Sequence, residues 1–193
     1  MRKIKEDELV GISDALADMF RNYKAYRLFF DDASLEKGIR AFFLYEVFCA
    51  LDFTYTVDGY DVIASVQTPC DKERPSKDFF SDDALSREFF LVVDKTAFDL
   101  AKEYVSFAHA LACKYMDPRT DFYIKNIGVA ERARGKGLLR KTIDILCGKS
   151  TVYLETHNEE NVAIYRKLGF TLLEKTDFHG VPVYAMSRKK TEQ

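Results

Sequence analysis

The fold is decided by the stretch Ile127-Gly128-Val129-Ala130-Glu131-Arg132-Ala133-Arg134-Gly135-Lys136-Gly137-Leu138-Leu139. This stretch has the pattern of an apolar strand, a charged loop with two glycines, and the start of an amphipathic helix. The N-terminus of a helix leaves about four backbone N–H groups unpaired and carries about half a positive charge, which attracts phosphate. Glycines let a phosphate touch those N–H groups, and Arg132, Arg134 and Lys136 add positive charge. The stretch therefore predicts a phosphate-binding loop.

Two common phosphate-binding loops do not match this stretch. A P-loop requires Ser or Thr after its Gly-Lys pair, whereas Gly135-Lys136 is followed by Gly137. A dinucleotide-binding loop requires a third glycine, and Arg140 occupies that position. One alternative stays open on this segment alone, namely that the glycines serve only the turn from strand to helix.

Strands and helices alternate through the last third of the chain. Period-two runs predict strands at residues 122–129, 151–156, 170–174 and 181–186, and helical spacing predicts helices at residues 135–147 and 162–168. A turn at His179-Gly180 joins the last two strands. This order predicts an α/β fold with a mixed sheet and helices on both faces.

The first part of the chain is mainly helical around one hairpin. Apolar spacing predicts helices at residues 6–21 and, after an N-cap at Ser34, at residues 35–47. A hairpin with Asp58-Gly59 at its turn follows, with strands at residues 53–57 and 62–66. Residues 68–82 form a polar loop, and residues 85–115 have helical spacing throughout. Because that is long for one helix of a small domain, we expect a break near Asp94–Thr96.

The composition fits a single globular domain over residues 1–193. Hydrophobic residues make up 47% and charged residues 31% of the chain, which is far from the composition of disordered proteins. The net charge is −2, and the longest basic run is Arg188-Lys189-Lys190, so nucleic acid is not expected as a partner. The polar start and the lack of an apolar run of about 18 residues predict neither a signal peptide nor a membrane span. We therefore expect a cytoplasmic protein.

The cysteines do not have the spacing of a metal site. The chain has four of them, at Cys49, Cys70, Cys113 and Cys147. They are widely scattered, and the chain has no CxxC pair and no His/Cys ligand spacing of a zinc site, so no metal is expected. Cys49, Cys113 and Cys147 lie in apolar helical stretches and are predicted to be small core residues.

A second motif follows the strand at residues 151–156. It consists of Asn158, Asn161-Val162, Tyr165 and Leu168-Gly169-Phe170. Together with Arg132-x-x-Gly135-x-Gly137, it resembles the two signature motifs of the GNAT (GCN5-related) N-acetyltransferase superfamily, in their usual order and separation. The resemblance covers residues 121–187. Residues 1–67 agree with the family only in the order of their elements, and residues 68–115 match nothing in it, so they are interpreted as a helical insertion before the fourth strand.

The resemblance implies a site for acetyl-coenzyme A. In this family the central sheet is splayed, and the pantetheine arm lies between two parallel strands, here those that end at Val129 and Glu155. The cofactor-binding residues implied in this way are Ile127, Gly128, Val129, Arg132, Arg134, Gly135, Lys136, Gly137, Leu138, Leu139, Asn158 and Asn161. Main-chain groups of Ile127 and Val129 would face the pantetheine and the thioester carbonyl, and residues 134–139 would surround the pyrophosphate. For Asn161 a helix-capping role is equally open.

The resemblance also implies a catalytic acid, and chemistry suggests a base. Tyr165 matches the family's tyrosine at the thioester sulfur and would give the departing thiolate a proton, the alternative being a packed aromatic residue. An amine of pKa about 10.4 is almost fully protonated at pH 7, so a base is expected near it. Glu155, at the end of its strand, is the candidate, and a structural carboxylate paired with Arg or Lys is the equal alternative. His157 is a weaker candidate base, whereas His109 is predicted to be structural and His179 to lie in an exposed turn.

These inferences together predict an N-acetyltransferase. It would transfer an acetyl group from acetyl-coenzyme A to a primary amine by direct attack in a ternary complex. A small-molecule amine is favoured as the acceptor, because residues 68–115 could roof a pocket. The alternatives are a protein-amine acetyltransferase, an acetyl-coenzyme A sensor without turnover, and a purely structural α/β domain. The oligomeric state is not decided by the sequence, and a homodimer is kept as one expectation.

Overall fold

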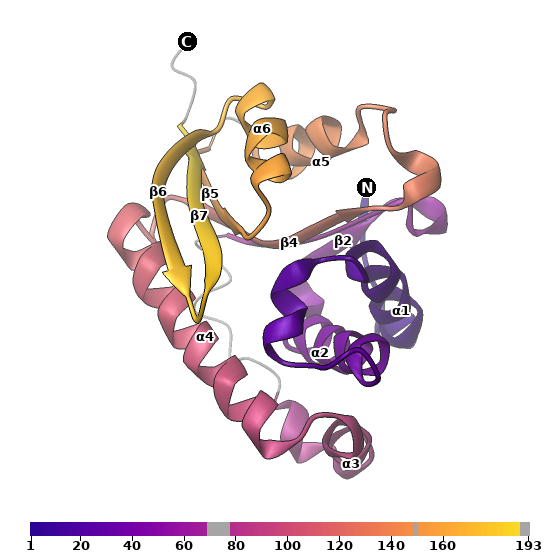
Figure 1. The fold of residues 1–193 in the computed structure, drawn as a ribbon. Helices are drawn as coiled ribbons and strands as arrows, with labels where there is room; N and C mark the ends of the chain where they lie inside the picture. The colour runs from indigo at the N-terminus through magenta and orange to yellow at the C-terminus, as the bar shows by residue number, and fades with distance from the viewer. Residues whose placement is uncertain (69–77, 149, 190–193) are drawn as a thin grey trace.

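The computed structural model describes residues 1–68, 78–148 and 150–189 (Figure 1). Its centre is a seven-stranded sheet in the order β1-β2-β3-β4-β5-β7-β6. The strands are β1 (Arg2–Lys3), β2 (Thr54–Thr56), β3 (Val62–Gln67), β4 (Phe122–Val129), β5 (Val152–Thr156), β6 (Thr171–Phe178) and β7 (Val181–Arg188). Neighbouring strands are antiparallel except for β4 and β5, which run parallel. The predicted mixed sheet is therefore confirmed.

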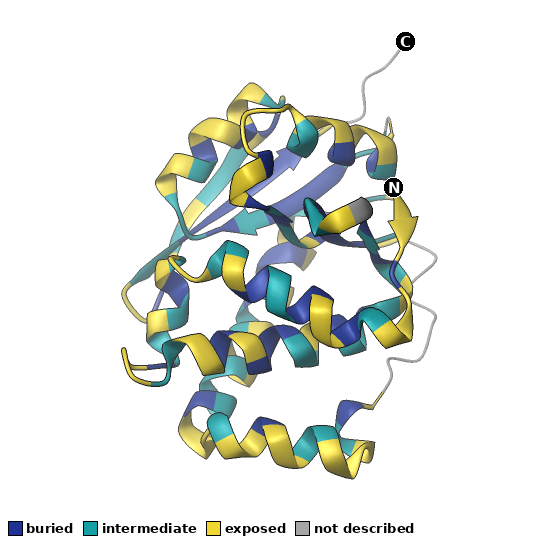
Figure 2. Ribbon diagram, turned by 90° about the vertical axis from the view of Figure 1, so that its right-hand side faces the viewer, coloured by how far each residue is buried: buried dark blue, intermediate teal, exposed yellow. Residues whose placement is uncertain are grey.

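Helices cover both faces of this sheet (Figure 1). They are α1 (Leu9–Phe20), α2 (Leu35–Cys49), α3 (Asp83–Val92), α4 (Lys95–Tyr115), α5 (Leu138–Cys147) and α6 (Glu159–Lys167). α5 and α6 lie on one face, and α1, α2 and α4 lie on the other, with α3 beside α2 at the far end of α4. The helices turn their buried residues towards the sheet and their exposed residues outwards (Figure 2). This arrangement confirms the predicted α/β fold with helices on both faces.

The sheet opens in its middle. β4 and β5 pair only from Phe122 with Val152 to Ile124 with Leu154. Beyond this point β4 continues to Val129 without a neighbour on that side. At the same place the register between β3 and β4 shifts, so that Lys125 is an extra residue between the two partners of Ser65 and Val66. A bulge of this kind bends a strand, so we attribute the separation of β4 from β5 to it.

Four apolar clusters hold the layers together. One lies between the sheet and α5 and α6, and it includes Leu154, Tyr165 and Met186. A second joins α1 and α2 to β3. A third is built mainly of aromatic rings from α2, α3 and α4, and a fourth joins α4 to β5 and β7. The helical segment before β4 therefore packs against α2 on one side and against the sheet on the other.

The predicted break in this helical segment is confirmed. α3 ends at Val92 and α4 begins at Lys95. The carboxylate of Asp94 accepts a hydrogen bond of 2.8 Å from the backbone N–H of Ala97, which caps the new helix. Of the polar loop predicted at residues 68–82, residues 69–77 lie outside the described residues, and residues 79–81 form a short 3₁₀ turn.

Three predicted helix starts and one buried cysteine need correction. The helix predicted at residues 162–168 begins earlier, at Glu159, directly after its N-cap Asn158. α5 begins at Leu138 instead of residue 135, because Gly135 and Gly137 have φ angles of 77° and 71°, which an α-helix does not allow. The first helix begins at Leu9, after a 3₁₀ turn at residues 6–8. Cys113 is exposed, while Cys147 is buried as predicted and Cys49 is half-buried. Cys70 lies outside the described residues.

Both hairpins turn where the sequence predicts. Gly59 and Tyr60 have φ angles of 71° and 58° between β2 and β3, and His179 and Gly180 have φ angles of 48° and 84° between β6 and β7. Two successive residues with positive φ match the right-handed twist of a hairpin. Within the part of the chain that the structure describes, no helix combines the length and the apolar character that crossing a membrane requires.

Candidate functional site

The free edge of β4 faces the gap that β5 leaves open. Ala130 donates its backbone N–H to the carbonyl of Asp61 at 2.9 Å, so it directs its main-chain groups towards β3. Hydrogen-bonding direction alternates along an antiparallel strand. Gly128, paired with Ile63, therefore also faces β3, whereas the main-chain groups of Ile127 and Val129 face the gap. This is the orientation expected of Ile127 and Val129 if an extended ligand takes the place of a strand.

Gly128 has a different part in the structure. A Cβ atom at this position would lie 2.5 Å from Sδ of Met19 and 3.2 Å from the ring of Phe20. α1 therefore packs directly on the backbone of β4 at Gly128. Gly128 therefore allows β4 to lie close to α1. Its own main-chain groups face β3, where it pairs with Ile63.

The loop before α5 presents a row of unpaired backbone N–H groups. Within the described residues, the N–H groups of residues 135–140 have no hydrogen-bond partner, and Gly137 provides no side-chain cap for α5. Cβ atoms added at Gly135 and Gly137 would meet no atom within 4 Å, so the space beside these N–H groups is open. The start of α5 therefore combines unpaired N–H groups with open space, as the predicted phosphate-binding loop requires.

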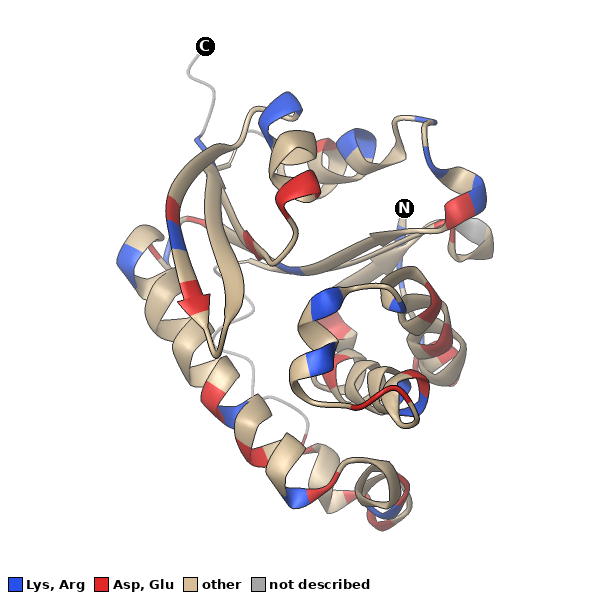
Figure 3. Cartoon of the chain, in the orientation of Figure 1, with Lys and Arg blue, Asp and Glu red and all other residues tan. Residues whose placement is uncertain are grey.

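The loop between β4 and α5 carries cationic residues (Figure 3), and their side chains have different contacts. Arg132 turns away from the N–H groups, because its guanidinium donates to Asp61 at 2.8 Å and to the carbonyl of Gly59. Arg134 is exposed and its Nε lies 3.4 Å from the carbonyl of Val129. Lys136 is exposed at the tip of the loop. Arg132 thus fastens the loop to the β2–β3 turn, which corrects the expectation that all three charges gather at one place.

The start of α6 settles which asparagine caps it. Asn158 is the N-cap, and its Oδ1 accepts a hydrogen bond of 3.0 Å from the backbone N–H of Glu160. Asn161 lies one turn into the helix, and its Nδ2 donates to Oγ1 of Thr156 at 3.2 Å. The capping role considered for Asn161 is therefore wrong, and both asparagines brace the end of β5 beside the gap.

Tyr165 reaches from α6 into the space beside this gap. The residue is buried and packs on Phe170, with ring centroids 5.5 Å apart. Its hydroxyl forms no hydrogen bond within the described residues, and the residue lines the large cavity of the protein. Burial, and secondarily the nearby Tyr23, raises the pKa of the Tyr165 phenol well above 10. The phenol therefore keeps its proton at every working pH.

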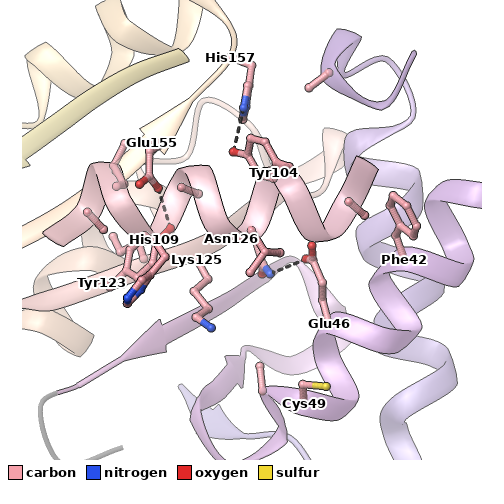
Figure 4. Close-up of a pocket in the computed structure, with 18 of the residues that line it drawn as sticks. Phe42, Glu46, Cys49, Tyr104, His109, Tyr123, Lys125, Asn126, Glu155 and His157 are labelled. Atoms are coloured by element: carbon pink, nitrogen blue, oxygen red, sulfur yellow. Dashed lines mark hydrogen bonds between the residues drawn. The ribbon is translucent and has the colours of Figure 1, made fainter. Parts of the chain in front are cut away.

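A cavity of about 1090 Å³ lies beneath the gap (Figure 4). Its walls come from α1, α2, α3, α4 and α6, from β4 and β5, and from the 3₁₀ turn at residues 24–28. The walls are mostly apolar and aromatic, with rings from Phe20, Tyr23, Tyr26, Phe29, Phe42, Tyr45, Phe53, Phe80, Phe89, Phe98, Tyr104, Tyr123 and Tyr165. The helices of the segment before β4 thus roof a pocket, as expected.

Glu155 is one of the acidic residues on this wall. Its Oε2 accepts a hydrogen bond of 2.7 Å from the hydroxyl of Tyr123 (Figure 4). Its Oε1 is buried without a partner among the described residues. Burial raises the pKa of the carboxyl group to about 7, and the hydrogen bond from Tyr123 opposes the shift. In the described part of the chain Glu155 has no ion pair with Arg or Lys, which was the structural alternative for it.

His157 is held between two tyrosines. Its Nδ1 lies 3.2 Å from the hydroxyl of Tyr23, and its Nε2 lies 2.9 Å from the hydroxyl of Tyr104. The backbone N–H of His157 also donates to Tyr23 at 2.7 Å. Burial lowers the pKa of the imidazole to about 4. The imidazole is neutral, and each of its nitrogens contacts a tyrosine hydroxyl, so it orients Tyr23 and Tyr104. These contacts argue against His157 as the catalytic base.

A second carboxylate, Glu46 of α2, faces the cavity opposite β4. Its Oε2 accepts a hydrogen bond of 3.3 Å from Nδ2 of Asn126 (Figure 4). Burial raises the pKa of this carboxyl group to about 7, while Lys125 and the bond from Asn126 lower it. Sequence reasoning missed Glu46. The available signal was its position four residues after Phe42 on the apolar side of a helix, where a charged residue is unusual.

The two other histidines both lie on or against α4, and His109 is one of the residues that line the cavity (Figure 4). His109 is exposed on α4, where its Nε2 lies 3.5 Å from Sγ of Cys113. His179 is exposed in the last hairpin, as expected, and its Nε2 lies 2.9 Å from Oε1 of Glu103 on α4. The contact of His179 fastens the hairpin to α4.

Comparison with known proteins finds a shared fold without a close relative. No protein-family model matches the sequence, and no curated protein matches it either. Among solved structures, a Corynebacterium glutamicum protein described as histone acetyltransferase HPA2 and related acetyltransferase is 16% identical, with a TM-score of 0.61, and the match covers 100% of this chain and 96% of that one. Arylalkylamine N-acetyltransferase 2 from Aedes aegypti is 15% identical, with 97% of each chain covered and a TM-score of 0.57.

A third neighbour is the C-terminal condensation domain of Ebony, solved in complex with β-alanyl-dopamine. It is 8% identical, with 96% of this chain and 95% of that chain covered and a TM-score of 0.65. Identities this low establish the arrangement of helices and strands and leave the chemistry to be argued from the site itself.

Proposed function

We propose that this chain, whose fold is that of the GNAT N-acetyltransferases, transfers an acetyl group from acetyl-coenzyme A to a small primary amine. The observation that carries the proposal is the gap between β4 and β5, which is bordered by main-chain groups of Ile127 and Val129 that no neighbouring strand pairs with. It opens towards the unpaired N–H groups of residues 135–140 on one side and onto the cavity on the other.

The residues around the gap fit the parts of acetyl-coenzyme A. The open space beside Gly135 and Gly137 suits a pyrophosphate, which needs N–H donors at close range. The edge of β4 suits the amide-rich pantetheine arm, since both can pair as neighbouring strands do. When bound, the cofactor supplies an acyl group activated as a thioester. The residues named here hold it, exclude water and move protons.

Proton transfer is assigned to two residues on opposite sides of the gap. An ammonium group that becomes an amide nitrogen loses two protons, and one of them ends on the released thiol. Glu155, with a carboxyl pKa raised to about 7, accepts a proton from the acceptor nitrogen. Tyr165, whose phenol stays protonated, donates a proton to the sulfur. A backbone N–H on the free edge of β4 stabilises the negative charge on the carbonyl oxygen.

The cavity supports an acceptor with an apolar body. Aromatic rings form most of its wall, and carboxylates stand at Glu155 and Glu46, so an amine attached to an aromatic or aliphatic group fits both features. The names of two structural neighbours agree with this class of acceptor, since one is an arylalkylamine N-acetyltransferase and the other is bound to β-alanyl-dopamine. The small-molecule acceptor is therefore preferred to a protein amine.

The proposed function is tested by thiol release from acetyl-coenzyme A with a panel of acceptors. The panel contains 2-phenylethylamine and tyramine, the diamine putrescine, and a peptide with a free N-terminus and a lysine. We expect the arylalkylamines to be acetylated with the highest kcat/KM. Preference for the peptide would favour a protein acceptor, and binding of the cofactor without thiol release from any amine would favour a sensor.

Replacement of Tyr165 by phenylalanine is expected to lower kcat about 100-fold, within the range for loss of a general acid. The loss stays moderate because a thiol of pKa about 8.5 leaves readily as a thiolate. Affinity for coenzyme A should change little, since the ring still packs on Phe170. Steady-state kinetics and a binding titration measure the two effects. Phe170→Leu is the matched control for packing, and unchanged turnover in Tyr165→Phe would remove the acid role.

A further inference from the structure

The cavity contains a carboxylate that the proposed mechanism has not yet used. Glu46 projects from α2 towards β4, on the wall opposite Glu155 (Figure 4). Within the described residues it takes part in no ion pair, and its one hydrogen bond is the 3.3 Å contact from Asn126. A carboxylate that faces an apolar cavity with so little compensation is costly, and such groups are commonly functional.

Glu46 is the more open of the two carboxylates. Its side chain is accessible, yet burial dominates its electrostatics. Both statements hold because it faces a cavity that a small molecule can enter, while the surrounding walls still shield the carboxylate from much of the solvent. Glu155 is more enclosed, with Oε1 buried and Oε2 bound by Tyr123. An amine that enters the cavity therefore finds free carboxylate oxygen at Glu46.

The position of Glu46 places it beside the proposed reaction. Asn126, its hydrogen-bond partner, directly precedes Ile127, whose main-chain groups face the gap between β4 and β5. Consecutive residues on a strand are about 3.3 Å apart. The carboxylate of Glu46 is thus bonded to the residue next to the one that would face the thioester.

The groups around Glu46 leave it able to take up a proton near neutral pH. Those in electrostatic or hydrogen-bond contact with it are Lys125 and Asn126 of β4, Tyr26 of the 3₁₀ turn, Tyr104 of α4, and Tyr45 and Cys49 of its own helix. Lys125 is the one cation in this set, and its Nζ lies 5.6 Å from the centre of the Phe53 ring. The pKa of the carboxyl group accordingly stays raised to about 7.

We propose that Glu46 binds the ammonium group of the acceptor and removes its first proton. This inference rests on the proposed function. The acceptor arrives as R–NH₃⁺, one proton passes to the carboxylate of Glu46, and R–NH₂ with its lone pair remains. The nitrogen then forms the bond to the acyl carbon, the bond from carbon to sulfur breaks, and its electron pair goes to the sulfur. Glu155 accepts the second nitrogen proton, and Tyr165 gives a proton to the sulfur. One of the two carboxyl groups returns a proton to Tyr165, and the other proton leaves to solvent.

The test uses two amines with the same body. 2-Phenylethylamine is protonated at pH 7, whereas the fluorines of 2,2-difluoro-2-phenylethylamine make its nitrogen far less basic, so much of it is already neutral. With the first amine, Glu46→Gln is expected to lower kcat/KM at pH 7 about 100-fold, and the loss should shrink as the pH rises. With the second, the loss should be less than about 10-fold, because there is little ammonium proton left to remove. Equal losses with both amines would assign Glu46 a structural role and overturn the proposal.

Controls separate this inference from the proposed function. Glu36→Gln changes an exposed glutamate at the start of the same helix and should leave kcat/KM unchanged. Glu46→Gln should keep the stabilisation by coenzyme A, because residue 46 is remote from the loop before α5. If Glu46→Gln folds poorly, Glu46→Leu serves instead, because it also removes the carboxylate and suits the apolar wall, and the same contrast between amines is expected. An active wild-type enzyme with an equally active Glu46→Gln refutes this inference alone, whereas a wild-type chain inactive with all amines refutes the proposed function.

Discussion

Replacement of Gly135 by valine is expected to abolish the binding of coenzyme A. Saturating coenzyme A should stabilise the wild-type protein by about 2.7 kcal/mol at 100 times Kd, which raises Tm by roughly 5–10 °C for a domain of this size. Gly135→Val should show no shift at the same concentration. The measurement is a thermal melt of each protein with and without coenzyme A, followed by a direct titration.

The expectation follows from the backbone of the loop. Gly135 has a φ angle of 77°, which a β-branched residue adopts only with strain of order 1–3 kcal/mol. A valine that escapes this strain must move the loop, and the N–H groups of residues 135–140 then lose their common direction. A valine that accepts the strain places its methyl groups in the open space that the phosphates would occupy.

Gly148→Val is the matched control. Gly148 caps the other end of the same helix, has a φ angle of 53° and also has open space beside it. The substitution therefore costs similar strain, yet it should keep the stabilisation by coenzyme A. Equal loss of the Tm shift in both variants would mean that α5 is merely destabilised. Retained affinity in Gly135→Val would remove the phosphate-binding role of the loop.

Replacement of Glu155 by glutamine is expected to lower kcat about 1000-fold with an alkylamine acceptor at pH 7, within the range for loss of a general base. Glutamine has the same shape and can keep the contact with Tyr123, so a loss of activity reports the lost proton acceptor. Affinity for coenzyme A should stay within a few-fold of the wild type. Tyr123→Phe is the companion variant, because it removes the hydrogen bond and leaves the carboxylate.

The pH dependence of kcat/KM tests whether Glu155, together with Glu46, must be ionised for activity. The pKa values of Glu46 and Glu155 are each raised to about 7, and each must be ionised to accept a proton. Activity should therefore fall as the pH drops below about 7, with log kcat/KM approaching a slope of about 2 in the wild-type enzyme. Glu155→Gln should leave a slope of about 1, from Glu46. A wild-type profile with no acidic limb would contradict the assignment of both carboxylates.

The elements of the proposed cofactor-binding half could be predicted because they are nearly continuous in sequence. One strand, one glycine loop and one helix start follow each other from Ile127 to Leu139, and local spacing alone predicts their order. The start of α5 was placed too early at residue 135 because helical spacing cannot show that Gly135 and Gly137 have left-handed φ angles. The side-chain direction of Arg132 depends on Asp61, which is distant in sequence and adjacent only in the folded sheet.

The acceptor half could not be predicted in the same way. The cavity brings together α2, the 3₁₀ turn at residues 24–28, α4 and the ends of β4 and β5, which are far apart along the chain. Glu46 meets Asn126 across 80 positions, and Tyr23 meets His157 across 134. Each of these residues is an ordinary member of an apolar helix or turn when its own segment is considered. The raised carboxyl pKa values arise only when tertiary packing removes the side chains from water.

The short pairing between β4 and β5 affects how strongly the unfolding of one half of the sheet is coupled to the unfolding of the other. Among the described residues, main-chain bonds connect β1–β4 to β5–β7 only along the stretch from Phe122 with Val152 to Ile124 with Leu154. The rest of this seam is joined by side-chain packing beneath α5 and α6. An extended ligand in the gap would bond to both halves and complete the ladder, so that the two halves unfold together more often than they do without it. The bound substrate would then take the place of a strand between β4 and β5 and add to the stability of the sheet.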